Sequence, residues 1–223
     1  MTISMKTVLL LRHARSTANA AGVLAGRMPG VQLDEVGISQ AKQLADCLKD
    51  LSIEFIVHSD LERTKQTVSP LASASGITLR EDQRITECDY GDWSGKELKQ
   101  LSSEPLWDSI QSTPSSVTFP GGEAMIDMQS RAVAALNFWR EEATSLFAMC
   151  SHGDVLKSLV AHAIGLPLDN FQGLHVSPAS ITVLQWDGSR WTLQALNAPA
   201  SKEAISSLTL PSQNVVGGGD VSA

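Results

Sequence analysis

The sequence predicts an α/β fold: a three-layer α/β/α sandwich on a mostly parallel sheet with one antiparallel edge strand. Short uninterrupted apolar runs, typical of strands buried on both faces, alternate along the chain with segments of helical periodicity. Late in the chain, Asp187-Gly188 joins two apolar stretches, which is the signal of a β-hairpin. This alternation favours helices on both faces of the sheet.

The size and composition fit one globular domain. The chain has 223 residues, 43% of them hydrophobic, which is enough for a substantial core. Its net charge of -7 disfavours nucleic acid and anionic membranes as partners. Three scattered cysteines form no C-x-x-C pair, and neither a signal peptide nor a run of roughly 20 apolar residues occurs. We therefore expect a cytoplasmic protein without a disulfide framework.

Strand and helix alternate regularly in the first part of the chain. Asp34 is suited to cap a helix, and Gly76 is suited to end the next one. Glycines and a proline punctuate the stretch after the first strand. The expected elements are a strand over 6–11, an irregular segment over 12–33, a helix over 34–49, a strand over 55–57, a helix over about 61–75 and a weak strand over 77–79.

A long irregular segment divides this part from the second. Residues 96–121 are expected to form a small lid with two short helical turns, because loops of this length are often functional. The domain is expected to span residues 1–198, and the Ala/Ser/Gly-rich tail over 199–223 is expected to be disordered. The elements after the lid are a helix over about 122–143, a strand over 146–150, a helix over 154–164 and hairpin strands over 181–186 and 191–196.

Polar side chains follow three of these strands at the point where each strand ends. Arg12-His13 follows the first, His58-Ser59 follows the second with Arg63 close behind, and Ser151-His152-Gly153 follows the fourth. The carboxyl ends of parallel strands share one edge of a sheet, which is where ligands bind in open α/β folds. We therefore expect two histidines and two arginines to converge in one crevice.

This set of residues predicts phosphoryl chemistry. Arg12, Arg63 and the helix N-terminus at Gly153 make an anion site of forked cations and free N–H groups. A neutral histidine there can attack phosphorus and form a phosphohistidine, while the second histidine steadies the transferring oxygens. A carboxylic acid is still needed to protonate the leaving oxygen and then to activate water.

Six ordered motifs, over about residues 6–197, resemble the histidine phosphatase superfamily in its phosphoglycerate mutase-like branch. The resemblance implies that family's fold and a phosphohistidine mechanism. The motifs are Arg12-His13-x-x-Ser16-x-x-Asn19, Asp34-x-x-Gly37-x-x-Gln40-Ala41, Ser59-x-Leu61-x-Arg63-x-x-x-Thr67, Glu87-x-x-x-Gly91-x-Trp93-x-Gly95, Pro120-Gly121-Gly122-Glu123 and Ser151-His152-Gly153.

The resemblance assigns a role to each matching residue. It implies that His13 is the phosphorylated nucleophile and that Glu87 is the general acid and then the base. Arg12, Arg63 and His152 would bind the phosphoryl group. The residues implied to line the substrate pocket are Arg12, Ser16, Asn19, Arg27, Arg63, His152 and Gly153. No cofactor is implied, and the two arginines beside the histidines disfavour a metal ion in the same pocket.

One residue departs from the family pattern. The family usually has glycine after the nucleophile, where this chain has Ala14. Alanine would be strained there if the position required positive φ. If the glycine serves close approach of phosphate, one methyl group is tolerable, and we predict a modest effect.

Three functions remain open, and hydrolysis of small phosphomonoesters is favoured. Phosphoglycerate mutases of the family carry extra cations, but Leu98 stands where their lysine is expected, and residues 100–121 contain neither arginine nor lysine. Asp154 also stands where mutases commonly have asparagine. A mutase is the first alternative, and a non-catalytic phospholigand-binding protein, supported only by Ala14, is the second. The sequence leaves the oligomeric state open, a homodimer included.

Overall fold

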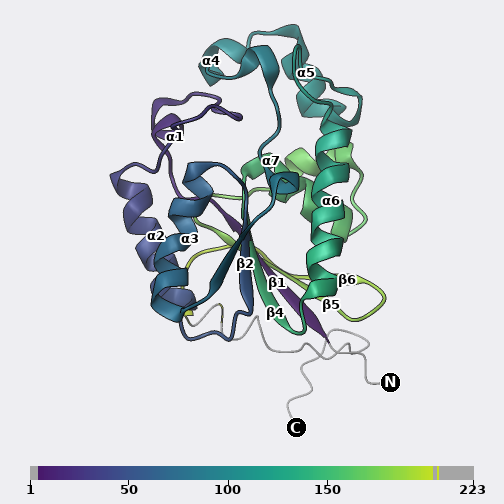
Figure 1. Cartoon of the computed structure of the whole chain (residues 1–223). Helices are drawn as coiled ribbons and strands as arrows, with labels where there is room; N and C mark the ends of the chain where they lie inside the picture. The colour runs from purple at the N-terminus through teal and green to yellow at the C-terminus, as the bar shows by residue number, and fades with distance from the viewer. Residues whose placement is uncertain (1–4, 203–204, 206–223) are drawn as a thin grey trace.

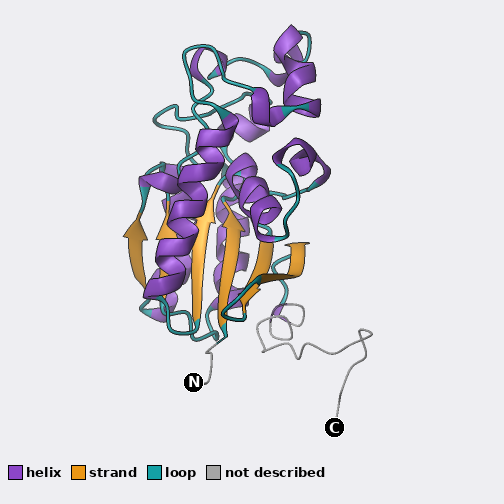
Figure 2. Cartoon of the chain, turned by 90° about the vertical axis from the view of Figure 1, so that its right-hand side faces the viewer, coloured by secondary structure: helices purple, strands orange, loops and turns teal. Residues whose placement is uncertain are grey.

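The structure is a computed structural model that describes residues 5–202 and 205. One six-stranded sheet runs through it, with helices on both of its faces (Figures 1 and 2). In spatial order the strands are β3 (Thr78–Glu81), β2 (Phe55–His58), β4 (Leu146–Ser151), β1 (Lys6–Arg12), β5 (Ile181–Trp186) and β6 (Trp191–Ala198).

The sheet is parallel from β3 to β1, and its antiparallel part is the hairpin of β5 and β6. The predicted three-layer α/β class is confirmed. The prediction of one antiparallel edge strand is refined, because β5 pairs antiparallel with β1 and β6 then covers the outer edge of β5.

Alternation along β1 divides the core into two parts. Val8 and Leu10 face one cluster, together with α6 (Met125–Glu142) and α7 (Gly153–Ala163). Leu9 and Leu11 face the other, on the side of α2 (Glu35–Leu48) and α3 (Glu62–Ser75). Successive strand side chains point to opposite faces, so an uninterrupted apolar run is what a strand covered on both faces requires.

Helices that cover the sheet begin and end close to the predicted positions. Asp34 caps α2 by accepting the Gly37 N–H at 2.7 Å, and Gly76 ends α3 with φ of 66°. The irregular segment after β1 contains a helix that was not predicted, α1 (Thr17–Ala21). Its five residues are too few to give a periodic apolar pattern.

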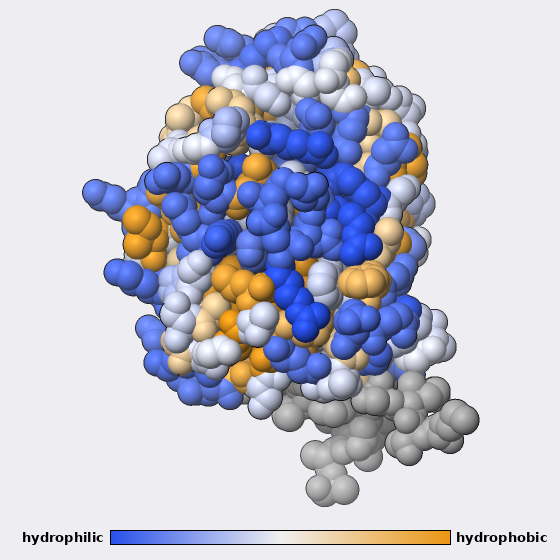
Figure 3. Space-filling model, in the orientation of Figure 1, coloured by the Kyte–Doolittle hydropathy of each residue, from blue (hydrophilic) through white to orange (hydrophobic). Residues whose placement is uncertain are grey.

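The expected lid consists of two short helices over the carboxyl edge of the sheet (Figure 1). These are α4 (Leu98–Leu101) and α5 (Pro105–Ser112), followed by one 3₁₀ turn over Pro114–Ser116. Leu101 and Ile110 are buried, while the outer surface at the top of the view is mostly hydrophilic (Figure 3). The lid therefore presents its apolar side to the interior.

Packing continues beyond the predicted domain boundary. Ile205 is 1% exposed and lies in the core cluster on the α2 and α3 side. Most of the tail predicted to be disordered, residues 206–223, lies outside the described residues. In the part of the chain that the structure describes, no helix is both long and apolar enough to cross a membrane.

Helix α2 holds the loop that follows β1. Gln40 Oε1 accepts the Arg15 N–H at 2.9 Å, and Asp34 pairs with the Arg15 guanidinium at 2.7 Å. A Cβ atom added at Gly37 would lie 1.9 Å from the Arg15 carbonyl oxygen. The motif Asp34-x-x-Gly37-x-x-Gln40 thus fixes the backbone immediately after the strand that carries Arg12-His13.

We predict that Gly37→Ala lowers the free energy of unfolding by about 1–3 kcal/mol, because the new methyl group forces helix and loop apart. Gly173→Ala is the matched control, since a Cβ atom there meets nothing within 4 Å. Urea denaturation of both variants checks this. Equal stabilities would contradict the tight contact.

Candidate active site

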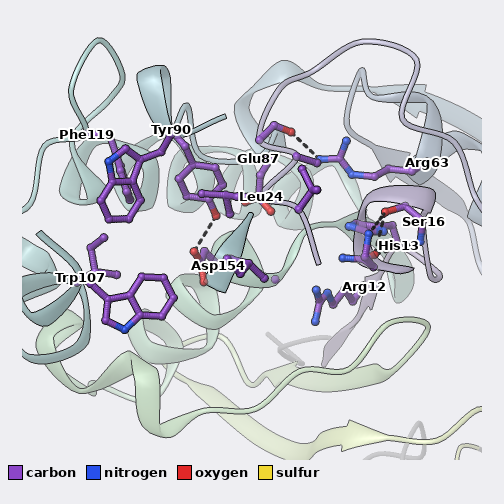
Figure 4. Close-up of a pocket in the computed structure, with 18 of the residues that line it drawn as sticks. Arg12, His13, Ser16, Leu24, Arg63, Glu87, Tyr90, Trp107, Phe119 and Asp154 are labelled. Carbon is purple, nitrogen blue, oxygen red and sulfur yellow. Dashed lines mark hydrogen bonds between the residues drawn. The ribbon is translucent and has the colours of Figure 1, made fainter. Parts of the chain in front are cut away.

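A cavity of about 260 Å³ lies where the carboxyl edge of the sheet meets the lid. The end of β1, the start of α7, the segment around Glu87 and the helices of the lid all contribute to its wall. Arg12, His13, Ser16 and Arg63 gather at one end of the cavity (Figure 4). The convergence predicted from three strand ends is therefore present.

His13 is held in one tautomer by its own backbone. Its Nδ1 lies 2.8 Å from the Ala14 carbonyl oxygen, which can only accept, so Nδ1 carries the proton and Nε2 keeps its lone pair. Burial, with the positive charges of Arg63 and Arg12, holds the pKa of His13 well below its usual value. The ring is therefore a neutral nucleophile at neutral pH.

His152 lies beside His13, with 5.1 Å between the ring centroids. Its Nε2 is 2.8 Å from Ser59 Oγ, at the end of β2, and its Nδ1 is buried without a partner. Burial, followed by the charge of Arg63, lowers the pKa of His152 well below its usual value. When the Ser59 hydroxyl donates to Nε2, Nδ1 bears the hydrogen and is free to donate to a ligand.

Arg12 reaches across the start of α7. Its Nη1 donates to the Val176 carbonyl at 2.6 Å, while its Nε is buried without a partner. A Cβ atom at Gly153 would lie 3.3 Å from the Arg12 Cζ, so glycine lets the guanidinium rest against the helix N-terminus. Cation and helix dipole then favour the same anion.

Arg63 is 2% exposed, which is rare for an arginine. Its Nη2 donates to the Gly26 carbonyl at 2.8 Å, and its Nη1 has no partner. Burial lowers the pKa of Arg63 from its usual value, and the charge of Glu87 opposes that shift. An arginine remains protonated under such conditions.

Three of the buried polar atoms without a partner therefore belong to this site: Arg12 Nε, Arg63 Nη1 and His152 Nδ1. The two arginine nitrogens are hydrogen-bond donors, and His152 Nδ1 is one when the Ser59 hydroxyl donates to Nε2. An unsatisfied buried donor costs about 1–3 kcal/mol, and a tetrahedral dianion offers several acceptor oxygens to such donors. We read this as a site shaped for a phosphoryl group.

Glu87 is buried in the same cavity, 8% exposed. Burial, together with the negative charge of Asp154, raises the pKa of Glu87 to about 7, and Arg63 opposes the rise. The Cys88 N–H donates to Glu87 Oε1 at 3.0 Å, and Tyr90 donates to Asp154 at 2.8 Å. A carboxyl group with this pKa is suited to exchange a proton near neutrality.

Two residues that were expected to line the pocket do not lie on the cavity wall: His152, which is fully buried beside His13, and Arg27. Arg27 Nε donates to the Glu87 carbonyl at 2.9 Å, and Arg27 Nη2 pairs with Glu123 at 2.9 Å. Arg131 also donates to the Glu87 carbonyl, at 3.1 Å, and pairs with Glu123, not with Asp127 as its helical spacing indicates. These cations brace the segment that carries Glu87.

Ser16 and Asn19 line the cavity as expected and also form the capping box of α1. Ser16 Oγ accepts the Asn19 N–H at 3.2 Å, and Asn19 Oδ1 accepts the Ser16 N–H at 3.0 Å. Their own hydrogen bonds therefore fix the turn that follows His13.

Ala14 is compatible with the site. Among the described residues, positive φ outside glycine occurs only at Ala179 and Asn197. The Ala14 methyl group is buried against Leu33, Ala41 and Ala179. Its N–H donates to Thr67 Oγ1 at 2.9 Å. The reading in which Ala14 is strained is therefore excluded.

Tyr90 and Phe119 line the cavity but were not singled out from the sequence, where no local pattern marks them. Ser59 was singled out at a strand end close to Arg63, and its hydroxyl lies 2.8 Å from His152 Nε2. No group of three or more histidine, cysteine or acidic side chains in the described residues is arranged to hold a metal ion.

An anion site with two histidines and a protonatable carboxyl group, at the carboxyl edge of an α/β sheet, is typical of enzymes that transfer phosphoryl groups. Comparison with known proteins identifies the family. Residues 8–199 match the sequence model of the histidine phosphatase superfamily (branch 1), and the chain belongs to it.

Relatives in this family carry more than one activity in their names. The probable phosphoglycerate mutase GpmB of Proteus mirabilis is 32% identical over 193 residues, which covers 84% of this chain and 88% of that protein. A mycobacterial glucosyl-3-phosphoglycerate phosphatase, Rv2419c, solved with VO3, is 28% identical with a TM-score of 0.77 and covers 86% of this chain and 99% of that one. Bacillus stearothermophilus YhfR is 25% identical with a TM-score of 0.82, covering 88% and 98%.

We expect Ala14→Gly to leave the kinetics of phosphate-ester hydrolysis nearly unchanged and to cost about 1–2 kcal/mol of stability. The variant loses one buried methyl group and gains backbone freedom. Steady-state kinetics and thermal unfolding measure the two effects. A large gain in activity would show instead that the methyl group obstructs the site.

Glu87 makes the stability of the fold depend on pH. It binds its proton more tightly in the folded protein, with a pKa of about 7, than in the unfolded chain, where the ordinary value is 4.5. This contribution is complete below pH 4.5 and is lost as the pH rises through 7. Relative to Glu87→Gln, the wild type should lose on the order of 3 kcal/mol between pH 4.5 and pH 8. Urea denaturation of both proteins at pH 4.5 and pH 8 measures this loss. If the difference in free energy of unfolding between the wild type and Glu87→Gln were the same at both pH values, the raised pKa would be ruled out.

Proposed function

We propose that this protein hydrolyses small phosphomonoesters without a metal ion, through a phosphohistidine on His13. The observation that carries the proposal is the set of three buried, unpartnered donors beside the neutral His13 ring: Arg12 Nε, Arg63 Nη1 and His152 Nδ1. We further propose that the protein acts in the cytoplasm on small molecules, without nucleic-acid or membrane partners, and we leave a homodimer open.

In the first step, Nε2 of His13 attacks phosphorus, and the bond from phosphorus to the ester oxygen breaks. The Glu87 carboxylic acid gives its proton to the leaving oxygen, which departs as an alcohol. The imidazole becomes a phosphoimidazolium, which keeps its proton on Nδ1 and donates it in a hydrogen bond to the Ala14 carbonyl. Arg12, Arg63 and His152 hold the charge on the phosphoryl oxygens.

In the second step, water attacks the phosphohistidine. The Glu87 carboxylate takes one proton of the water as the new oxygen–phosphorus bond forms, and the phosphorus–nitrogen bond breaks. Inorganic phosphate leaves, and both His13 and Glu87 return to their starting forms. A pKa of about 7 lets one Glu87 side chain act as an acid and then as a base.

Phosphate transfer within phosphoglycerate is the second candidate function, favoured by the name of the GpmB relatives. A mutase must hold a carboxylate as well as a phosphate and must keep water from the phosphohistidine. The lid segment over 100–121 has neither arginine nor lysine, and Leu98 and Asp154 line the cavity. Hydrolysis therefore fits this lid better than transfer does.

Hydrolysis of p-nitrophenyl phosphate at mildly acidic pH, with and without EDTA, tests the proposal. We expect turnover that EDTA does not reduce and that His13→Ala abolishes. Addition of 3-phosphoglycerate with its 2,3-bisphosphate cofactor tests the mutase. Saturable binding of phosphate esters without any turnover would identify a phospholigand-binding protein and overturn the proposal.

The acid role of Glu87 predicts a dependence on the leaving group. Glu87→Gln should lower kcat/KM for an alkyl phosphate by about 10²–10⁴-fold. p-Nitrophenyl phosphate should lose much less in that measurement, because its leaving group departs without protonation. For the wild type with an alkyl phosphate, kcat/KM should fall as the pH rises through about 7. Equal losses for both esters would contradict the acid role.

A further inference from the structure

Beyond the phosphoryl site, the cavity is lined by aromatic side chains. Trp93 and Trp107 stack with centroids 6.4 Å apart and planes 18° apart, and Phe119 packs edge-on against Trp93 at 5.7 Å. Tyr90, Trp107 and Phe119 lie across the cavity from Arg12 and His13 (Figure 4). The other apolar side chains of the wall are Val23, Leu24, Ala25, Leu98 and Ile110.

The charges of the wall are divided unequally between its two ends. Among the residues that line the cavity, all within the described part of the chain, the arginines and lysines are Arg12 and Arg63, and both serve the phosphoryl site. Asp154, which is also on the wall, accepts a hydrogen bond from Tyr90 at 2.8 Å. Lys157 is not part of the wall, and its Nζ lies 3.5 Å from Asp154 Oδ1.

From this arrangement we infer the substrate class: phosphomonoesters of uncharged alcohols that carry one or two apolar rings, with esters of hydroxy acids disfavoured. The inference rests on the proposed hydrolysis at His13. A flat ring gains contact area and ring stacking against Trp107 and Phe119. A carboxylate in the same place would lose its hydration without gaining a cation as a partner, and the negative charge of Asp154 would repel it. Both effects disfavour binding.

The size of the cavity sets the size of the alcohol. Its volume of about 260 Å³ is just below the range of roughly 300–1,000 Å³ common for small-molecule sites. Gln111 adds a neutral amide to the wall, which suits a hydroxyl or ether oxygen on the ring, whereas the Gln172 amide is engaged by Lys157 and the Ile110 carbonyl.

Three alkyl esters test the substrate class, because they require the same proton from Glu87. We expect kcat/KM for benzyl phosphate to exceed that for 3-phosphoglycerate by at least about tenfold, and to exceed that for ethyl phosphate as well. Trp107→Ala should reduce the ratio of benzyl to ethyl phosphate by about tenfold. Trp191→Ala is the matched control, since Trp191 packs at a tilt against Trp186, does not line the cavity and should leave the ratio unchanged.

Asp154→Asn tests whether Asp154 repels the carboxylate of 3-phosphoglycerate, separately from the effect of Asp154 on the pKa of Glu87. The substitution removes a negative charge that also acts on Glu87, but this effect is common to both alkyl esters and cancels in their ratio. We expect the ratio of benzyl phosphate to 3-phosphoglycerate to fall by roughly five- to tenfold. An unchanged ratio would remove Asp154 from the specificity argument.

Binding of phosphonates decides the inference independently of hydrolysis. By calorimetry, benzylphosphonate should bind more tightly than phosphonoacetate, which carries a carboxylate. Tighter binding of benzylphosphonate without hydrolysis of any ester would uphold the aromatic subsite and overturn the hydrolase. Hydrolysis with 3-phosphoglycerate equal to or better than benzyl phosphate would overturn the substrate class and leave the hydrolase standing. Absence of both phosphonate binding and turnover would overturn both.

Discussion

The whole site depends on the parallel pairing of β1 with β4. Their register aligns Arg12 with Ser151, and the His13 N–H continues the ladder to the Ser151 carbonyl at 2.9 Å. Each strand therefore ends at the same level, and the next residue of each is a histidine of the site. Backbone hydrogen bonds between the two strands therefore bring the histidines side by side, and their ring centroids lie 5.1 Å apart. The loops and helices around this pair then only have to supply cations, a carboxylic acid and a cover.

Burial gives these groups their chemistry. Arg63 loses most of its contact with water, and burial of His13, together with the charges of Arg63 and Arg12, lowers the pKa of that ring and keeps it neutral. Burial and the negative charge of Asp154 both raise the pKa of Glu87, so that its carboxyl group keeps its proton up to near-neutral pH. Unpaired buried donors reduce the stability of the free protein, and a phosphoryl group relieves that cost. In the proposed reaction, the site is organised around the negative charge that the substrate brings.

Prediction from the sequence succeeded where local patterns determine structure. Continuous apolar runs identified the strands, and polar residues at their ends identified Arg12, His13, Arg63 and His152. Pairwise contacts between distant segments have no such local signal. Arg131 shares a helix with Asp127 but pairs with Glu123, and Arg27 crosses to the same carboxylate, because the Glu87 backbone carbonyl offers both cations a second acceptor. The backbone conformation of Ala14 could not be predicted from the sequence either, because it depends on the packing of α2.

The proposed mechanism requires that His13 become phosphorylated during turnover. Rapid acid-free quenching with a slowly hydrolysed ester, followed by peptide mass spectrometry, measures this directly. We expect one phosphoryl group on the peptide that contains His13, accumulating further in Glu87→Gln when p-nitrophenyl phosphate is the donor and absent in His13→Ala. Turnover without any phosphorylated peptide, or with the phosphoryl group on His152, would contradict it.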